Sequence, residues 1–125
     1  MINDKLVKDL QEQIDNIIDS GSNYIKYKDG TMIIYGEKTF NTISVIGYGS
    51  LYRSVSVPYD DYPIEFKSIP IVSYSIKSLS PNANSAVISV LHPSTKTNAG
   101  NVCIIKENNS QISGTVSYIA IGKWK

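Results

Sequence analysis

Two tyrosines and two aspartates stand together in one short segment, Tyr59, Asp60, Asp61 and Tyr62, just ahead of a proline. This combination suits saccharide binding, because a tyrosine ring offers an apolar face to sugar C–H groups and carboxylates accept hydrogen bonds from sugar hydroxyls. The alternative is a turn in which the aspartates bond to their own backbone. We treat all four side chains as candidate glycan-binding residues on a solvent-exposed loop.

A second polar segment starts at His92 and continues through Ser-Thr-Lys-Thr-Asn-Ala-Gly, so His92 and Asn98 join the candidate glycan-binding residues. His92 is the only histidine and Cys103 the only cysteine, which falls short of the four protein ligands of a structural zinc site. An ion on a symmetry axis would need several copies of His92 or Asp60 to converge. We therefore expect no metal and no cofactor.

The alternative to saccharide binding is an enzymatic function. A glycosidase needs two carboxylates roughly 5 to 9 Å apart across the scissile bond, whereas the consecutive Asp60 and Asp61 point to opposite sides of an extended chain. A Ser-His-acid triad has only His92 as its base, and no nucleophile-elbow sequence accompanies it. The sequence thus favours a protein that is not an enzyme.

The first twenty residues read as a helix ended by Gly21. Val7, Leu10, Ile14 and Ile17 are spaced 3, 4 and 3 apart, which is the spacing of a coiled-coil seam, so these four are the candidate oligomerisation residues. Isoleucine at both core positions favours three strands over two. An amphipathic helix of this length also packs on its own domain in many proteins, so both interpretations stay open.

From residue 21 the apolar period changes to two, which indicates strands. Asp29-Gly30 lies between two apolar runs, a strong hairpin signal. The alternation from Ile43 to Val57 predicts one long strand bent at Gly47 and Gly49. Further strands are expected at 69–77, 86–91, 102–106 and 114–124. Six or seven short strands without intervening helices predict a mostly β fold, an antiparallel β-sandwich over residues 21–125 behind a helical domain over residues 1–20.

If every connection reverses the chain, loops 28–31, 58–68 and 92–101 share the end opposite the helix. Loops 38–42, 78–85 and 106–113 then share the helix end, where Asn82 would be a control position. The candidate glycan loops would form a distal tip, and an extra turn at Gly47 would invert that assignment. Alanine at Tyr59, Asp61, Tyr62 or His92 is then expected to weaken attachment without changing the melting temperature.

Charge and cysteine content narrow the partners. The formal net charge is +1 and the basic residues are scattered, so no focused patch for nucleic acid exists. The lone Cys103 forms no internal disulfide, which fits folding in a reducing cytosol. The N-terminus lacks the pattern of a signal peptide, and no apolar run is long enough to insert into a membrane.

Three motifs resemble the C-terminal domain of bacteriophage tail fibres: NYIKYKDGTMIIYG, the Phe66-to-Pro70 step in PIEFKSIPIVSYSI, and the Gly122-Lys123-Trp124 tail of YIAIGKWK. The chain departs from that pattern at Ile34, where cysteine is more usual, and at Tyr118, where tryptophan is. The resemblance covers residues 21–125. It implies an H-type-lectin-like, six-stranded sandwich that trimerises and attaches particles to bacterial sugars.

These observations predict the receptor-binding domain of a phage or phage-like tail fibre, a homotrimer in the virion tail that binds a bacterial cell-surface saccharide. Its N-terminus would join other tail or baseplate proteins. Threefold presentation would add avidity to weak sites. The alternative is a structural tail or baseplate protein that trimerises and caps a fibre without binding glycan.

Overall fold

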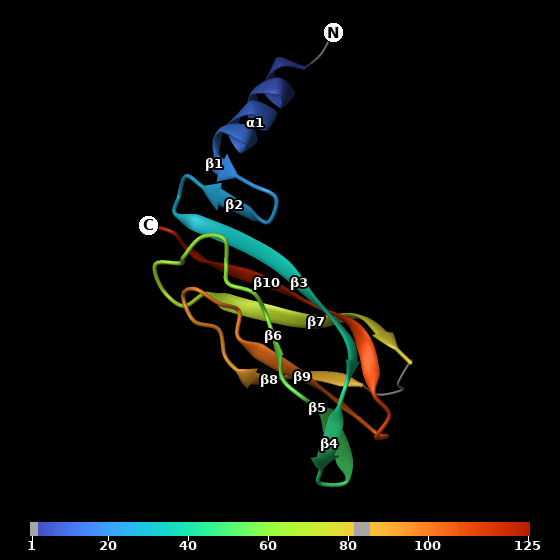
Figure 1. Ribbon diagram of the computed structural model, residues 1–125. Helices are drawn as coiled ribbons and strands as arrows, with labels where there is room; N and C mark the ends of the chain where they lie inside the picture. Colours follow the sequence, from blue (N-terminus) through green and yellow to red (C-terminus); the bar gives the residue numbers. More distant parts are fainter. Residues whose placement is uncertain (1–2, 82–85) are drawn as a thin grey trace.

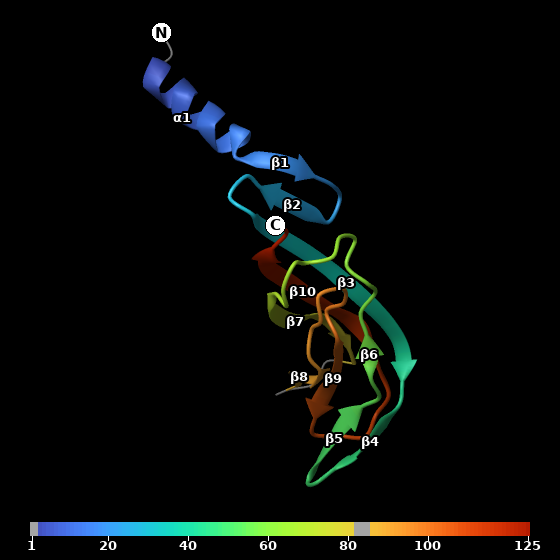
Figure 2. The same cartoon turned by 90° about the vertical axis from the view of Figure 1, so that its left-hand side faces the viewer.

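The computed structural model describes residues 3–81 and 86–125, and within them the protein is mostly β, with one helix and two antiparallel sheets packed as a sandwich (Figures 1 and 2). The predicted fold class is confirmed. The described residues form ten strands, more than the six or seven expected. The elements are α1 (Asp4–Asp15), β1 (Ile17–Ser20), β2 (Tyr24–Tyr27), β3 (Thr31–Ile43), β4 (Val45–Tyr48), β5 (Leu51–Ser54), β6 (Val57–Pro58), β7 (Ile71–Ser80), β8 (Val87–His92), β9 (Asn101–Lys106) and β10 (Ile112–Lys123).

The N-terminal helix projects away from the sandwich (Figure 2). Asn3 caps it, because its Oδ1 accepts a hydrogen bond from the Lys5 backbone N–H at 2.9 Å. The exposed fractions of Leu6, Val7 and Leu10 are 55%, 49% and 52%. Because these three apolar side chains are about half exposed, the apolar stripe of the helix is not buried against its own domain.

The prediction of a helix through Ser20 is wrong at its end. α1 stops at Asp15, and Ile17 lies in β1, where it pairs with Tyr27 of β2. β-branched isoleucines favour strands, and β1 gains a ladder of backbone hydrogen bonds by adding to the edge of β2. Ile17 is therefore no coiled-coil d position, and the side chain of Ile14 lies outside the described residues.

The first sheet has the order β1-β2-β3-β10-β7, and its inner face supplies much of the core. Alternate residues of β3 and β10 point inward, so period-2 alternation separates a buried face from an outer one. The fully buried inward residues of these two strands are Met32, Ile34, Ile112, Val116 and Ala120.

The second sheet contains β4, β5, β9 and β6, with β8 on the other side of β9. The prediction of one strand from Ile43 to Val57 is wrong, because Tyr48 pairs with Leu51 across a two-residue turn of Gly49 and Ser50. Gly49 has φ +62°, as the first position of a type II′ hairpin turn requires. The β4–β5 hairpin projects from the sandwich at the end away from α1 (Figure 1).

The two ends of the sandwich are not those expected. Loops 28–31, 59–70 and 93–100 do share one end, because Thr31 pairs with Lys123, and Pro58 with Asn101. The additional strand β1 reverses the chain once more, so α1 emerges at this same end, where the Lys28 N–H donates to the Asn16 carbonyl at 2.7 Å. The predicted tip loops thus lie at the helix end, and the opposite, distal end carries the β4–β5 hairpin and loop 107–111. Asn82 lies outside the described residues.

Candidate functional site

The two predicted glycan loops lie side by side and are joined through their backbones. The Tyr59 N–H donates to the Gly100 carbonyl at 3.1 Å, the Tyr62 N–H to the Thr97 carbonyl at 2.7 Å, and the Phe66 N–H to the Lys96 carbonyl at 2.9 Å. Sequence reasoning had placed them at one end of the molecule but had not predicted this pairing. The loops therefore form one ordered unit.

Asn98 is at the centre of this unit. Its Nδ2 donates to the Tyr59 carbonyl at 2.9 Å and to Asp61 Oδ1 at 3.1 Å, and its Oδ1 accepts from the Gly100 N–H at 2.6 Å. An amide offers two donors and one acceptor oxygen, and all of these groups are engaged. Asn98 thus acts as a clamp between the loops, and its amide hydrogens are not available to a saccharide.

Tyr59 and Tyr62 are not exposed platforms, which corrects the prediction for both. Their exposed fractions are 3% and 7%, and both rings pack in edge-on contacts with Tyr118, at centroid distances of 4.9 and 5.7 Å. The Tyr59 hydroxyl donates to the Ser117 carbonyl at 3.1 Å, and the Tyr62 hydroxyl bonds to Ser94 Oγ at 2.7 Å.

Burial has a clear electrostatic effect on these phenols, since it disfavours the charged form. It raises the pKa of Tyr62 to about 12, and it raises the pKa of Tyr59 further, with Tyr74 and Tyr118 adding to that shift. Tyr59 and Tyr62 therefore act as core aromatics.

The other candidate glycan-binding side chains in this region are exposed but do not form one cluster. Asp60 forms an ion pair with Lys38 at 2.9 Å, and the Asp60 side chain is 81% exposed. Asp61 is held by Asn98, while His92 Nδ1 lies 3.4 Å from the Asn101 amide. Asp60 and Asp61 do border a hollow of about 90 Å³ together with Glu37, Asn23, Gly36, Pro63 and Tyr118.

The three motifs of the family resemblance meet at the helix end. The Trp124 N–H donates to the Gly30 carbonyl at 2.9 Å, and its indole N–H to the Tyr27 carbonyl at 2.8 Å. A Cβ on Gly122 would lie 2.9 Å from Phe66 and 3.1 Å from Pro70. The hairpin, the Phe66-to-Pro70 step and the C-terminal tail thus form one structural lock.

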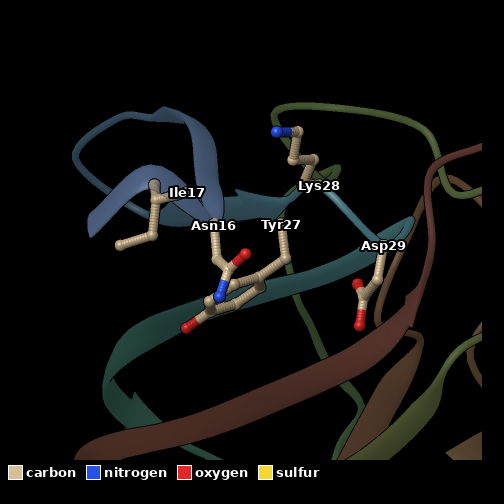
Figure 3. Close-up of a pocket in the computed structure, with 5 residues that line it drawn as sticks. All are labelled: Asn16, Ile17, Tyr27, Lys28 and Asp29. Carbon is tan, nitrogen blue, oxygen red and sulfur yellow. The ribbon is translucent and has the colours of Figure 1, made fainter. Parts of the chain in front are cut away.

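A hollow of about 460 Å³ lies where α1 joins the sandwich, lined by Asn16, Ile17, Tyr27, Lys28 and Asp29 (Figure 3). Lys28 points to the side opposite Asn16 and Asp29 in this view. Asp29 Oδ1 accepts from the Thr31 N–H at 2.8 Å, which lowers the pKa of that carboxyl. The hydrogen bond from the Lys28 N–H to the Asn16 carbonyl indicates that this hollow lies at a junction that fixes the helix to the hairpin.

Sequence reasoning missed the surface at the distal end. We define the distal surface as Ile46, Tyr48, Leu51 and the loop 107–111. The exposed fractions of Ile46, Tyr48 and Leu51 are 45%, 55% and 43%. The signal was present, since Gly49-Ser50 between two apolar runs is a two-residue hairpin signature.

Loop 107–111 follows β9 directly beside β5, because Lys106 pairs with Tyr52. Its five residues, Glu107 to Gln111, are exposed and polar. Lys106 is buried and shapes the loop from below, as its Nζ donates to Asn108 Oδ1 at 2.8 Å and to the Ser110 carbonyl at 2.5 Å. Burial lowers the pKa of this lysine. The distal surface thus combines an exposed aromatic residue with the neutral polar side chains of loop 107–111 and the carboxylate of Glu107.

Neither a metal site nor a membrane helix is found where the chain is described. No group of three His, Cys, Asp or Glu side chains among residues 3–81 and 86–125 is arranged to hold a metal ion. No helix in those same ranges is long and apolar enough to span a membrane.

An R1 pyocin fibre from P. aeruginosa, in a structure of its C-terminal part, matches with a TM-score of 0.51 and 16% identity over 83% of this chain and 27% of that one. The protein shares the fold of part of a pyocin fibre. A P. aeruginosa R2 pyocin fibre matches with a TM-score of 0.49 and 17% identity, over 84% of this chain and 25% of the fibre structure.

An N-truncated R2-type pyocin tail fibre also matches with a TM-score of 0.49 and 17% identity, covering 84% of this chain and 36% of that one. The protein therefore spans only about a quarter to a third of these pyocin fibre structures. No protein-family model and no curated protein matches the sequence.

Proposed function

We propose that the protein is the receptor-binding domain of a phage or phage-like tail fibre, a non-enzymatic homotrimer that binds a bacterial surface saccharide. The observation that carries the proposal is the polarity of the molecule, with α1 at one end of a pyocin-fibre-like sandwich and an open distal surface at the other. A fibre domain needs this arrangement, because one end must continue into the particle and the other must meet the host.

The distal surface is the preferred saccharide site. The Tyr48 ring is more than half exposed, so it can stack on sugar C–H groups, and Asn109 and Gln111 of the neighbouring loop supply donors and acceptors. Arg53 lies on the same face of the hairpin as Tyr48, since it pairs with Ile46. Asp60, Asp61 and His92 at the helix end are the second candidate surface.

Assembly into a homotrimer would raise the overall affinity for the saccharide. A homotrimer presents three weak sites at once, and several fibres on one particle multiply the effect. We expect the helical stub to lead towards other tail or baseplate proteins, with the domain in the virion tail.

Binding to an array of bacterial surface polysaccharides, with the fluorescently labelled full chain as the probe, tests this proposal. We expect selective binding to a subset of the saccharides. Tyr48→Ala should weaken it, because losing an anchoring aromatic typically costs about 2 kcal/mol, or roughly thirtyfold in affinity.

Asp60→Ala and His92→Ala, at the helix end, are the matched controls and should leave binding within about twofold, because isolated exposed residues away from a site contribute little. Loss of binding in these variants, with Tyr48→Ala unaffected, would place the site at the helix end instead. A chain that binds no saccharide, even as a multivalent probe, would favour the alternative function of a structural trimerisation or capping protein.

A further inference from the structure

Four isoleucines form a row across the outer face of the first sheet. The strand register pairs Ile25 with Ile33, Ile33 with Ile121, and Ile121 with Ile71, which crosses β2, β3, β10 and β7 in order. All four side chains lie on one face, because directly paired residues of antiparallel strands point to the same side.

A second pair extends this row. Tyr35 and Ile119 are paired across β3 and β10, two residues further along each strand, and so lie on the same face. We call Ile25, Ile33, Tyr35, Ile71, Ile119 and Ile121 the isoleucine face. The exposed fractions of Ile71, Ile119 and Ile121 are 81%, 52% and 46%. Contiguous apolar groups of this kind on a soluble domain mark an interaction surface.

Beyond this row, towards the distal end, the outer face carries polar side chains that pair with one another. Lys77 forms an ion pair with Glu37, Ser75 hydrogen-bonds to Ser117 at 2.7 Å, and Thr39 to Thr115 at 3.0 Å. A partner that covers these positions therefore leaves neither the Lys77 nor the Glu37 charge unpaired.

Shape also favours a protein partner. Three small serines, Ser73, Ser75 and Ser117, border a hollow of about 330 Å³ beside Tyr35 and Ile119. Side chains of a neighbouring protein can enter such a hollow. A saccharide would find few hydrogen-bond partners along the isoleucine row, since isoleucine has no polar side-chain atom.

The area that a stable interface buries indicates which protein covers the isoleucine face. A stable interface buries roughly 800 Å² on each partner, more than six side chains can supply, so the isoleucine face must be used together with another apolar surface. The exposed stripe of α1, with Leu6, Val7 and Leu10, projects from the same end of the molecule, because β1 joins the helix to this very sheet.

We infer that the isoleucine face is the surface on which sandwiches of the homotrimer pack against one another, continuing the contact made by the helices. This inference rests on the proposed homotrimer and deepens it. Each occupant is a second copy of this chain, because a symmetric assembly that joins the helical stripes also brings the attached sandwiches together.

Thiol accessibility in the native protein tests the inference without disrupting the assembly. In a single chain, the 81% exposed Ile71 is more accessible than the 52% exposed Val87 on β8 of the second sheet. We expect the reverse order in solution: Ile71→Cys should react with a bulky maleimide at least tenfold more slowly than Val87→Cys. The native Cys103 is 1% exposed, so the unsubstituted chain gives the background rate.

Both variants should react equally fast in urea, which checks the intrinsic reactivity of the two thiols. Light scattering complements the rates: Ile71→Glu should reduce the trimeric mass of the parent to the 13.8 kDa of one chain, whereas Val87→Glu should leave it unchanged.

The outcomes separate this inference from the proposed function. A trimeric parent in which Ile71→Cys reacts as fast as Val87→Cys overturns the inference and leaves the homotrimer intact. A parent with the mass of a single chain overturns both the inference and the homotrimer, while saccharide binding on the array is judged independently.

Discussion

At the scale of single residues, the tyrosines connect the loops to the core. Tyr59, Tyr62 and Tyr74 each point a hydroxyl from the core at a backbone carbonyl or serine of a neighbouring segment. A phenylalanine would fill the same space without that bond. The sequence predicted that tyrosine would be important at 59 and 62, but the wet, amphipathic character that suits sugar binding also suits a loop anchored to a core, and composition alone does not separate the two.

Tyr62 provides the test at this scale. Tyr62→Ala should reduce the free energy of unfolding by about 3–5 kcal/mol, as expected for removing a buried aromatic ring. Tyr62→Phe should lose about 1 kcal/mol, since it removes only the hydroxyl bonded to Ser94. Urea unfolding measures both.

The exposed Tyr48 is the matched control, and Tyr48→Ala should change the stability by less than about 0.5 kcal/mol. Equal stabilities of Tyr62→Ala and Tyr48→Ala would contradict the burial of Tyr62.

At the scale of elements, regular patterns with strong turn residues were predictable. β7, β8, β9 and β10 begin and end within three residues of the bounds expected. The Asp29-Gly30 hairpin was also expected, and Gly30 adopts φ +98° there. These segments were predicted because alternation and turn chemistry indicate the same structure.

The errors occur where one pattern fits two structures. The alternation from Ile43 to Val57 is the same for a bent strand and for a hairpin whose two turn residues are Gly49 and Ser50. At the end of α1, Ile17 continues the apolar spacing of the helix, but it also fits a strand that pairs with β2. Only the strand pairing itself, Tyr48 with Leu51 and Ile17 with Tyr27, decides between the alternatives.

The lock formed by the three motifs can be tested with one glycine. Gly122→Ala should destabilise the protein by about 1–3 kcal/mol, because the new methyl group would press on the buried Phe66 ring. Gly47→Ala is the control from another strand, since its methyl group would meet no atom within 4 Å. Thermal unfolding of both variants measures the difference, and similar losses at the two positions would argue against the lock.

At the scale of the whole molecule, the sequence predicted two functional ends but assigned them the wrong way round. The four-residue strand β1 alone reverses the helix relative to the loops. The surface nominated for the host therefore lies at the helix end, and we propose the distal surface as the saccharide site in its place.

The buried tyrosines give the whole molecule a defined response to alkali. The pKa values of Tyr59, Tyr62 and Tyr118 are raised above the ordinary 10.0. A raised pKa in the folded state means that stability is fully present below the unfolded value and is lost as pH rises through the folded one. We therefore expect these tyrosines to leave the stability unchanged well below pH 10 and to reduce it from pH 10 towards pH 12.

Ultraviolet absorbance of tyrosinate during a pH titration, followed together with circular dichroism, checks this. The exposed tyrosines should ionise first, and the buried ones only as the fold is lost. Ionisation of all nine tyrosines in one step near pH 10, with the fold intact, would contradict the buried cluster.

The order of the first sheet has a consequence for how the chain folds. β10 is the last strand along the chain, yet it sits between β3 and β7 in the middle of the sheet. Until it inserts, β3 and β7 both present unpaired edges, which are templates for aggregation. Folding must therefore wait for the most distant partner in the sequence, and we expect slow, cooperative folding without a stable half-sheet intermediate.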